Sequence, residues 1–214
     1  MKFPTTKLKI ALAQLTPQDG EMETNIVKVI HAIKNAASRG ADVVVFPEKF
    51  LTGYALVLME ENPNVYAVSQ GDERLSRIGQ CCQENKIHAI VGSPFKKGEH
   101  FYISSLVFGP TGEIEAIYDK NYLFHTESSL FKAGSALSMI EMKGWKLGLG
   151  ICYDARFPQH AQRLANRGCH VYLVCALFSQ GVGDAELKSW FPARAKDNGI
   201  YAIVCNFTGT TGGF

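Results

Sequence analysis

Three reactive side chains stand at points where the sequence predicts that β-strands end. Cys152 closes the apolar segment KLGLGIC, Glu48 directly follows VVVFP, and Lys120 closes IEAIYDK. A thiolate can attack a carbon centre, a carboxylate can carry the proton, and an ammonium group can stabilise developing negative charge. A free cysteine is often simply buried, and a strand-terminal acid or amine is often simply solvated. Functional groups gather at strand ends in α/β proteins, so the three together favour nucleophilic catalysis.

Two histidines offer a competing partner for this thiol, because His125 and His160 lie close in sequence to the candidate residues. Either could form a cysteine–histidine pair, and the spacing selects neither. Gly148 and Gly150 begin a GxG sequence, but Tyr153 stands where the dinucleotide-binding fingerprint needs glycine. The sequence contains no phosphate-binding loop motif and no tightly spaced metal-ligand motif. We therefore expect neither a nucleotide nor a metal at the site.

Strand-like and helix-like segments alternate along the chain that must position these residues. Apolar or alternating runs predict strands over 9–15, 41–47, 87–92, 171–177 and 201–207. Helical spacing and capping residues predict helices over 24–38, 71–84, 158–167 and 184–198. The turn GPTG and the segment Lys143-Gly144-Trp145 each join two further strand-like runs. Strands separated by helices, with central hairpins, predict a layered α/β domain with a mixed sheet.

Composition is that of an ordinary globular protein, and 214 residues predict a single domain, 1–214. A formal net charge of +2 does not indicate a nucleic-acid partner or a membrane surface. No apolar run reaches the ~20 residues of a membrane span, and the start of the chain shows no signal-peptide cleavage site. The six cysteines form no CxxC pair, which is typical of a reducing compartment, and we expect a cytoplasmic protein.

Four sequence blocks, in order, resemble the carbon–nitrogen hydrolase (nitrilase) superfamily. They are FPEKFLTGY at 46–54, YDKNYLF at 118–124, GICYDARFPQ at 150–159 and WFPARAKDNGIYAIVCNFTG at 190–209. The resemblance implies a four-layer αββα sandwich that forms a homodimer or higher homo-oligomer. It also implies hydrolysis of a non-peptide C–N bond in a small-molecule amide, with no metal or organic cofactor. Relatives usually continue with further strands after the position of GTTGGF, so we expect a sandwich lacking its usual C-terminal strands.

Carried over residue by residue, the resemblance implies that Glu48 is the general base, Lys120 the catalytic lysine and Cys152 the nucleophile. Glu127 resembles a second glutamate that contacts the lysine or the substrate amide in many relatives; a solvated loop acid is the alternative. We expect Lys120 and the backbone N–H of Tyr153 to stabilise an oxyanion, and nearby positive charge to favour the Cys152 thiolate. Departure of ammonia would leave a thioester, which water activated by Glu48 would hydrolyse.

Further residues are expected to shape this site. Asp154 and Arg156 should support the turn that carries the cysteine, and we favour Arg156 orienting Asp154 over Arg156 facing the substrate. Tyr122 stands where many relatives have a histidine, two residues after the lysine. Aromatic side chains are expected to form the walls of the substrate pocket, although each could equally belong to the core: Phe46, Tyr54, Phe178 and Trp190.

The segment CYDARFP resembles the omega-amidase-like and deaminated-glutathione-amidase-like branches. It implies a small-amide hydrolase that releases ammonia and a carboxylate. Hydrolysis of N-carbamoyl compounds or of nitriles is the alternative chemistry within the superfamily. From another class, the alternative is a catalytically impaired fold that acts as a binding or assembly module, because an unpaired strand edge invites association. The reactivity of Cys152 relative to Cys169 discriminates the enzyme from the module.

Overall fold

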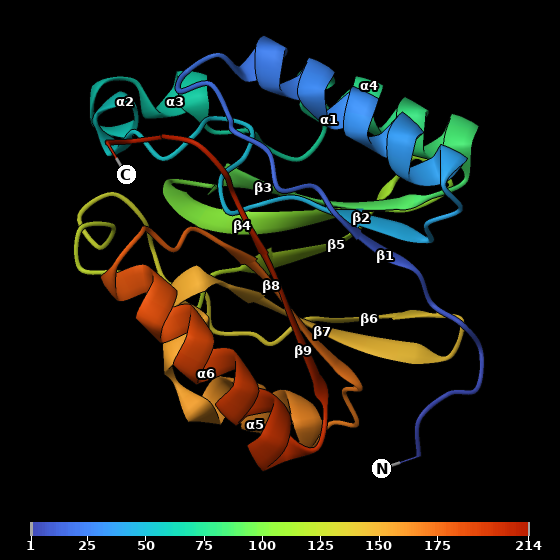
Figure 1. The fold of residues 1–214 in the computed structure, drawn as a ribbon. Coiled ribbons are helices and arrows are strands. Elements are labelled where there is room, and N and C mark those ends of the chain that lie inside the picture. The colour runs from blue at the N-terminus through green and yellow to red at the C-terminus, as the bar shows by residue number, and fades with distance from the viewer. Residues whose placement is uncertain (1, 214) are drawn as a thin grey trace.

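Two β-sheets pack face to face in the computed structural model, which describes residues 2–213 (Figure 1). The larger sheet contains, in spatial order, β1 (Ile10–Leu12), β2 (Val43–Val45), β3 (His88–Lys97), β4 (His100–Phe108) and β5 (Ile114–Asp119). The smaller sheet contains β6 (Met139–Met142), β7 (Trp145–Ile151), β8 (Val171–Ala176) and β9 (Tyr201–Asn206). Each sheet combines parallel and antiparallel neighbours, so both sheets are mixed.

Helices cover the outer face of each sheet (Figure 1). The larger sheet is covered by α1 (Met22–Ser38) and α4 (Glu73–Asn85), and the smaller sheet by α5 (Pro158–Ala165) and α6 (Val182–Asn198). Two short helices, α2 (Leu56–Glu61) and α3 (Pro63–Tyr66), follow the loop after β2 and lie near the C-terminal segment in Figure 1. The layers therefore follow the order helix, sheet, sheet, helix, and the expected αββα sandwich is confirmed.

Side-chain alternation along β2 shows how the sandwich divides its core. Val43 and Val45 pack between the two sheets, whereas Val44 and Phe46 pack in the layer beneath α1 and α4. Successive side chains of a strand point to opposite faces, so a strand between a helical layer and a second sheet is apolar on both sides. A third apolar cluster lies between the smaller sheet and its own helices, α5 and α6.

The elements differ from the sequence predictions mainly in their lengths. Strand β3 runs to Lys97, five residues beyond the predicted end at 92, and forms a long hairpin with β4 that was not predicted. The short helices α2 and α3 were also not predicted. The predicted start of α4 is confirmed, because the Asp72 carboxylate accepts the backbone N–H of Arg74 at 3.0 Å. In the described part of the chain, no helix is long and apolar enough to cross a membrane.

The strand directions bring two candidate residues to one edge of the larger sheet. Because β2 is parallel to β3, while β4 is antiparallel to both β3 and β5, strands β2 and β5 end at the same edge. Glu48 follows β2 and Lys120 follows β5. Gly92 of β3 lets the loop after β2 pass closely, since a Cβ atom there would lie 2.5 Å from the Pro47 carbonyl oxygen and 2.6 Å from the Lys49 nitrogen.

Candidate active site

Lys120, Glu48 and Glu127 form a buried ionic cluster. The Lys120 ammonium donates to Glu48 Oε1 at 2.7 Å and to both carboxylate oxygens of Glu127, at 2.9 and 2.8 Å. Each of the three side chains is at most 1% exposed. Glu127 is thus an internal partner of Lys120 and not a solvated loop acid, and the two carboxylates fix the position of the ammonium group.

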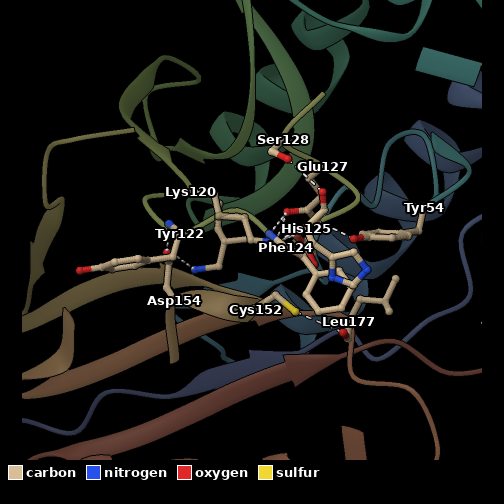
Figure 2. A network of polar contacts seen from close by, with 12 residues as sticks. Tyr54, Lys120, Tyr122, Phe124, His125, Glu127, Ser128, Cys152, Asp154 and Leu177 are labelled. Carbon is tan, nitrogen blue, oxygen red and sulfur yellow. Dashed lines mark hydrogen bonds and ion pairs between the residues drawn. The ribbon is translucent and has the colours of Figure 1, made fainter. Parts of the chain in front are cut away.

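Glu127 is itself held by two further donors. The Tyr54 hydroxyl donates to Glu127 Oε1 at 2.6 Å, and the Phe124 backbone N–H donates to Oε2 at 2.8 Å. Figure 2 shows Glu127 between Lys120 and Tyr54, with all three from different segments of the chain. Tyr54 was expected as a pocket wall, but this bond to Glu127 was not foreseen. The lysine therefore depends on a network that also includes a cavity residue.

The charges of this cluster follow from burial and pairing. Burial alone lowers the pKa of Lys120, but Glu48 and Glu127 outweigh it, so the pKa is raised and the amine stays protonated. Burial raises the pKa of Glu127, but Lys120 reverses this effect and holds the pKa below its usual value. For Glu48 burial prevails over the attraction of Lys120, and its pKa is raised. A carboxylate with a raised pKa is better suited to exchange protons near neutral pH.

One oxygen of Glu48 is left open for chemistry. Within residues 2–213, Glu48 Oε2 is buried and has no hydrogen-bond partner, while Oε1 is bound to Lys120. A buried acceptor without a donor is costly and uncommon in folded proteins, and such sites are often functional. Glu48 can therefore accept a proton at Oε2 while its other oxygen keeps Lys120 in place.

Cys152 sits at a sharp turn between β7 and a short 3₁₀ helix, Cys152–Arg156. Its backbone φ of +42° lies in the left-handed region, which is strained for a residue with a side chain. The thiol donates to the Leu177 carbonyl oxygen at 3.2 Å (Figure 2). Strain of this kind persists where the surrounding structure enforces it, and here it fixes the direction of the sulfur atom at the strand end.

The resting thiol is protonated. Burial and the negative charge of Glu48 both raise the pKa of Cys152, and Lys120 opposes them only in part. Lys120 thus favours the thiolate, as expected, but burial and Glu48 outweigh it in the unliganded site. A protonated thiol must lose its proton before or as it attacks a carbon centre, so the site needs a base.

Asp154 connects the cysteine turn to the segment that follows Lys120. Its Oδ2 accepts the Tyr118 hydroxyl at 2.6 Å and the Ile151 N–H at 2.8 Å. Its Oδ1 accepts the N–H groups of Asn121 and Tyr122, at 3.1 and 2.9 Å. This fully buried carboxylate thus occupies the expected supporting place at the turn, and burial raises its pKa to about 6.

The arginine that contacts the cysteine turn most directly is Arg194, not Arg156. Buried Arg194 donates to the carbonyl oxygens of Ala155 and Arg156, at 3.0 and 2.8 Å. The Arg156 side chain is exposed and lies over the ring of Tyr153, 5.3 Å from its centroid. The described contacts include no hydrogen bond or ion pair between Arg156 and Asp154. The structure therefore does not support the expected role of Arg156 in orienting Asp154. Arg194 lies in the ARA segment of the fourth sequence block, which was the signal for it.

Neither candidate histidine pairs with Cys152 in the described contacts. His160 is buried between the hydroxyl groups of Tyr118 and Tyr172, at 2.8 and 3.0 Å. Burial lowers the pKa of His160 to about 4, so this ring is neutral. His125 is exposed and packs against Phe124. The cysteine–histidine alternative has no geometric support.

A cavity of about 220 Å³ opens above the thiol. Of the four expected wall residues, Tyr54 and Phe178 line it. Phe46 does not, because it packs on Phe50 beneath α1, and Trp190 lies behind Phe178 with ring centroids 5.8 Å apart. The lining also includes Lys120, Phe124, Cys152, Tyr153, Leu177, Ser179, Val182, Gly183 and Glu186.

A second buried lysine, Lys49, was not singled out from the sequence. Its ammonium lies 3.7 Å from the centroid of the Tyr54 ring, and burial lowers its pKa to about 8. Glu48 and Glu127 oppose this lowering. The sequence signal was its position directly after Glu48.

The backbone N–H of Tyr153, the second residue of the 3₁₀ helix, belongs to the first turn of that helix, where N–H groups lack partners within the helix.

An αββα sandwich with a cysteine at a strained strand end, beside a lysine held by two buried glutamates, defines a class of nucleophilic hydrolase site. Comparisons with known proteins agree with this class. Residues 9–213 match the carbon–nitrogen hydrolase family. The chain belongs to this family, and it is a cysteine-dependent amidohydrolase of the nitrilase superfamily, as the sequence predicted.

Individual relatives share most of this chain. It is 32% identical over 210 residues to omega-amidase NIT2-B of Xenopus laevis, covering 94% of this chain and 74% of that protein. It is 31% identical over 211 residues to omega-amidase NIT2 of Homo sapiens, covering 94% and 75%. An amidase from Nesterenkonia sp. superposes with a TM-score of 0.87 at 28% identity, covering 96% of this chain and 78% of that one. A variant of that amidase carries the acetamide moiety of fluoroacetamide on its active-site cysteine.

Proposed function

We propose that this protein hydrolyses the amide group of a small molecule through a thioester on Cys152. The observation that carries the proposal is the Lys120 ammonium, held by two buried carboxylates beside a cysteine whose thiol is protonated at rest. The nucleophile and the fixed positive charge line one cavity, and Glu48, with one open oxygen, is bound to Lys120 behind it. These are the parts that acyl transfer needs.

Each step can be assigned to a group of this chain. Glu48 takes the thiol proton as Cys152 Sγ bonds to the amide carbon, and the carbonyl electrons move onto oxygen. Lys120 and the Tyr153 N–H stabilise this oxyanion. The C–N bond then breaks, Glu48 gives its proton to the departing nitrogen, and ammonia and a thioester result. Water attacks the thioester with Glu48 as base, and the carboxylic acid leaves as the sulfur regains its proton.

An amide is favoured over a nitrile or an N-carbamoyl compound because the relatives described above are omega-amidases and an amidase. The test is ammonia release from a panel of simple amides, nitriles and N-carbamoyl compounds by the full chain. We expect turnover of amides by the wild type and by Cys81→Ala, a control that removes a buried thiol on α4, and none by Cys152→Ala. Turnover of only nitriles or only N-carbamoyl compounds would overturn the assignment to amides.

The inactive-module alternative is tested by labelling with an amide-shaped electrophile, chloroacetamide, at neutral pH. We expect Cys152 to be alkylated much faster than the buried Cys169, because the site positions an amide against this sulfur. Equal rates at the two cysteines would favour a binding or assembly module.

Two further expectations remain proposals. We propose a homo-oligomer, supported by β9, an edge strand of the smaller sheet that carries the 56%-exposed Tyr201. Light scattering at micromolar concentration tests this, and a single monomeric species would contradict it.

We also propose a reducing compartment, the cytoplasm, supported by six cysteines that are all unpaired. Localisation of the tagged full-length protein tests it.

A further inference from the structure

The cavity above Cys152 contains one charge that the proposed mechanism does not use. Among its lining residues, the charged side chains are Lys120 and Glu186. Lys120 is committed to Glu48 and Glu127. Glu186 is half-buried on the second turn of α6, and within residues 2–213 it forms no ion pair. Its carboxylate is therefore available to whatever enters the cavity.

The buried charges behind the cavity do not offset Glu186. By their ordinary charges, Glu48 and Glu127 contribute two negative charges, and Lys120 and Lys49 contribute two positive charges. The buried set then sums to zero, so Glu186 is left as the uncompensated charge in the lining. A negative charge there favours cationic and disfavours anionic ligands.

Apart from Glu186, the walls are suited to a short hydrocarbon chain. Apolar and aromatic side chains make up much of the lining: Phe124, Tyr153, Leu177, Phe178 and Val182. Methylene groups leave water favourably when they pack against such side chains. The cavity therefore presents the thiol for an amide, apolar walls for a spacer and a carboxylate for a polar tail.

We infer that Glu186 selects the tail of the substrate, and that the preferred substrate is an aliphatic amide ending in an ammonium or guanidinium group. This inference rests on the proposed amidase function. A monoamide of a dicarboxylic acid fits less well, because its second carboxylate would meet Glu186 while Lys120 is already paired. Arg156 lies over the Tyr153 ring and is not among the residues that line the cavity.

Three amides of similar length separate the effect of charge from that of shape: 4-aminobutanamide, pentanamide and succinamate. The readout is kcat/KM for ammonia release by the full chain. We expect the cationic amide to exceed the neutral one by about tenfold, the effect of one partly buried charge pair, and the anionic amide to be the poorest. In Glu186→Gln the cationic-to-neutral ratio should fall close to one, and in Glu186→Lys the order of the two charged amides should reverse.

Asp184→Asn is the matched control, because it removes one negative charge from the same helix at a position that does not line the cavity. It should keep the wild-type ranking. A flat ranking, a preference for succinamate, or an equal effect of Asp184→Asn would overturn the inference, while turnover of pentanamide through Cys152 would leave the amidase function standing.

If none of the amides is turned over, that result counts against the proposed function. A binding measurement then still tests the role of Glu186. Butylammonium should protect Cys152 from alkylation by chloroacetamide better than butyrate does, and Glu186→Gln should abolish the difference. Equal protection by the two ions in the wild type would overturn the role of Glu186.

Discussion

Replacing Glu127 by Gln probes whether this residue positions the lysine through its charge. The wild-type carboxylate receives two contacts from Lys120 and one each from Tyr54 and Phe124. Glutamine has one acceptor oxygen, and its NH₂ group must face at least one of these donors. A buried donor left unpaired costs about 1–3 kcal/mol, and loss of one partner of a buried ion pair costs about 3–5 kcal/mol. Because Glu48 still holds Lys120, we expect about 3 kcal/mol of lost unfolding free energy.

The catalytic effect of Glu127→Gln should be larger than its effect on substrate binding. Loss of a positioned oxyanion donor typically lowers kcat by about 10²–10³, and we expect this range with a smaller change in KM. The negative charge of Glu127 also contributes to the raised pKa of Glu48. Without that charge Glu48 loses its proton more easily, so the acidic limb of the kcat/KM profile should move to lower pH.

The assay combines urea unfolding, steady-state ammonia release and a pH profile. Tyr54→Phe is the matched control, because it removes a hydrogen bond to Glu127 but keeps the charge. It should lower kcat moderately and leave the acidic limb in place. Wild-type kcat and an unmoved acidic limb in Glu127→Gln would refute the proposed positioning role.

Three further changes test the surroundings of the site. Asp154→Asn should lower unfolding free energy by about 2–4 kcal/mol in urea titrations, because an amide cannot accept all four donors of this carboxylate. Arg194→Met should lower kcat at least tenfold in steady-state assays by releasing the turn carbonyls of Ala155 and Arg156. Lys49→Met should add up to about 3 kcal/mol of unfolding free energy at pH 7, since burial lowers the folded-state pKa of Lys49 to about 8 from its ordinary 10.5. The folded wild type binds fewer protons than the unfolded chain between those two values, so its stability should rise with pH across that window, and the variant should lose this rise. A less stable variant or an unchanged slope would contradict the burial of Lys49.

The fold was largely predictable because its elements carry strong local patterns. Helix α1 buries apolar side chains at helical spacing, and the strands of both sheets are short apolar runs between turn residues. The extension of β3 was not predictable in this way. Pro94 and the two lysines Lys96 and Lys97 argue locally against a strand, and the pairing with β4 overrides them.

The site was predictable where chemistry-bearing residues stand at strand ends, and less so where its contacts are long-range. Phe46 was misplaced because strand alternation turns it, together with Val44, toward the helical layer and away from the thiol. Arg194 and Glu186 come from α6 and reach the cysteine turn and the cavity only through the packing of that helix. No local sequence pattern specifies such packing.

The most direct test of covalent catalysis by Cys152 is the mass of the enzyme during turnover. Wild-type protein mixed with an excess of a simple amide and quenched in acid within the first turnovers should carry one acyl group on the peptide containing Cys152. The adduct should be removed by hydroxylamine, as a thioester is, and should be absent from Cys152→Ala, which should release no ammonia. Ammonia release by the wild type with no adduct in a burst phase, together with near-normal turnover by Cys152→Ala, would contradict covalent catalysis by this cysteine.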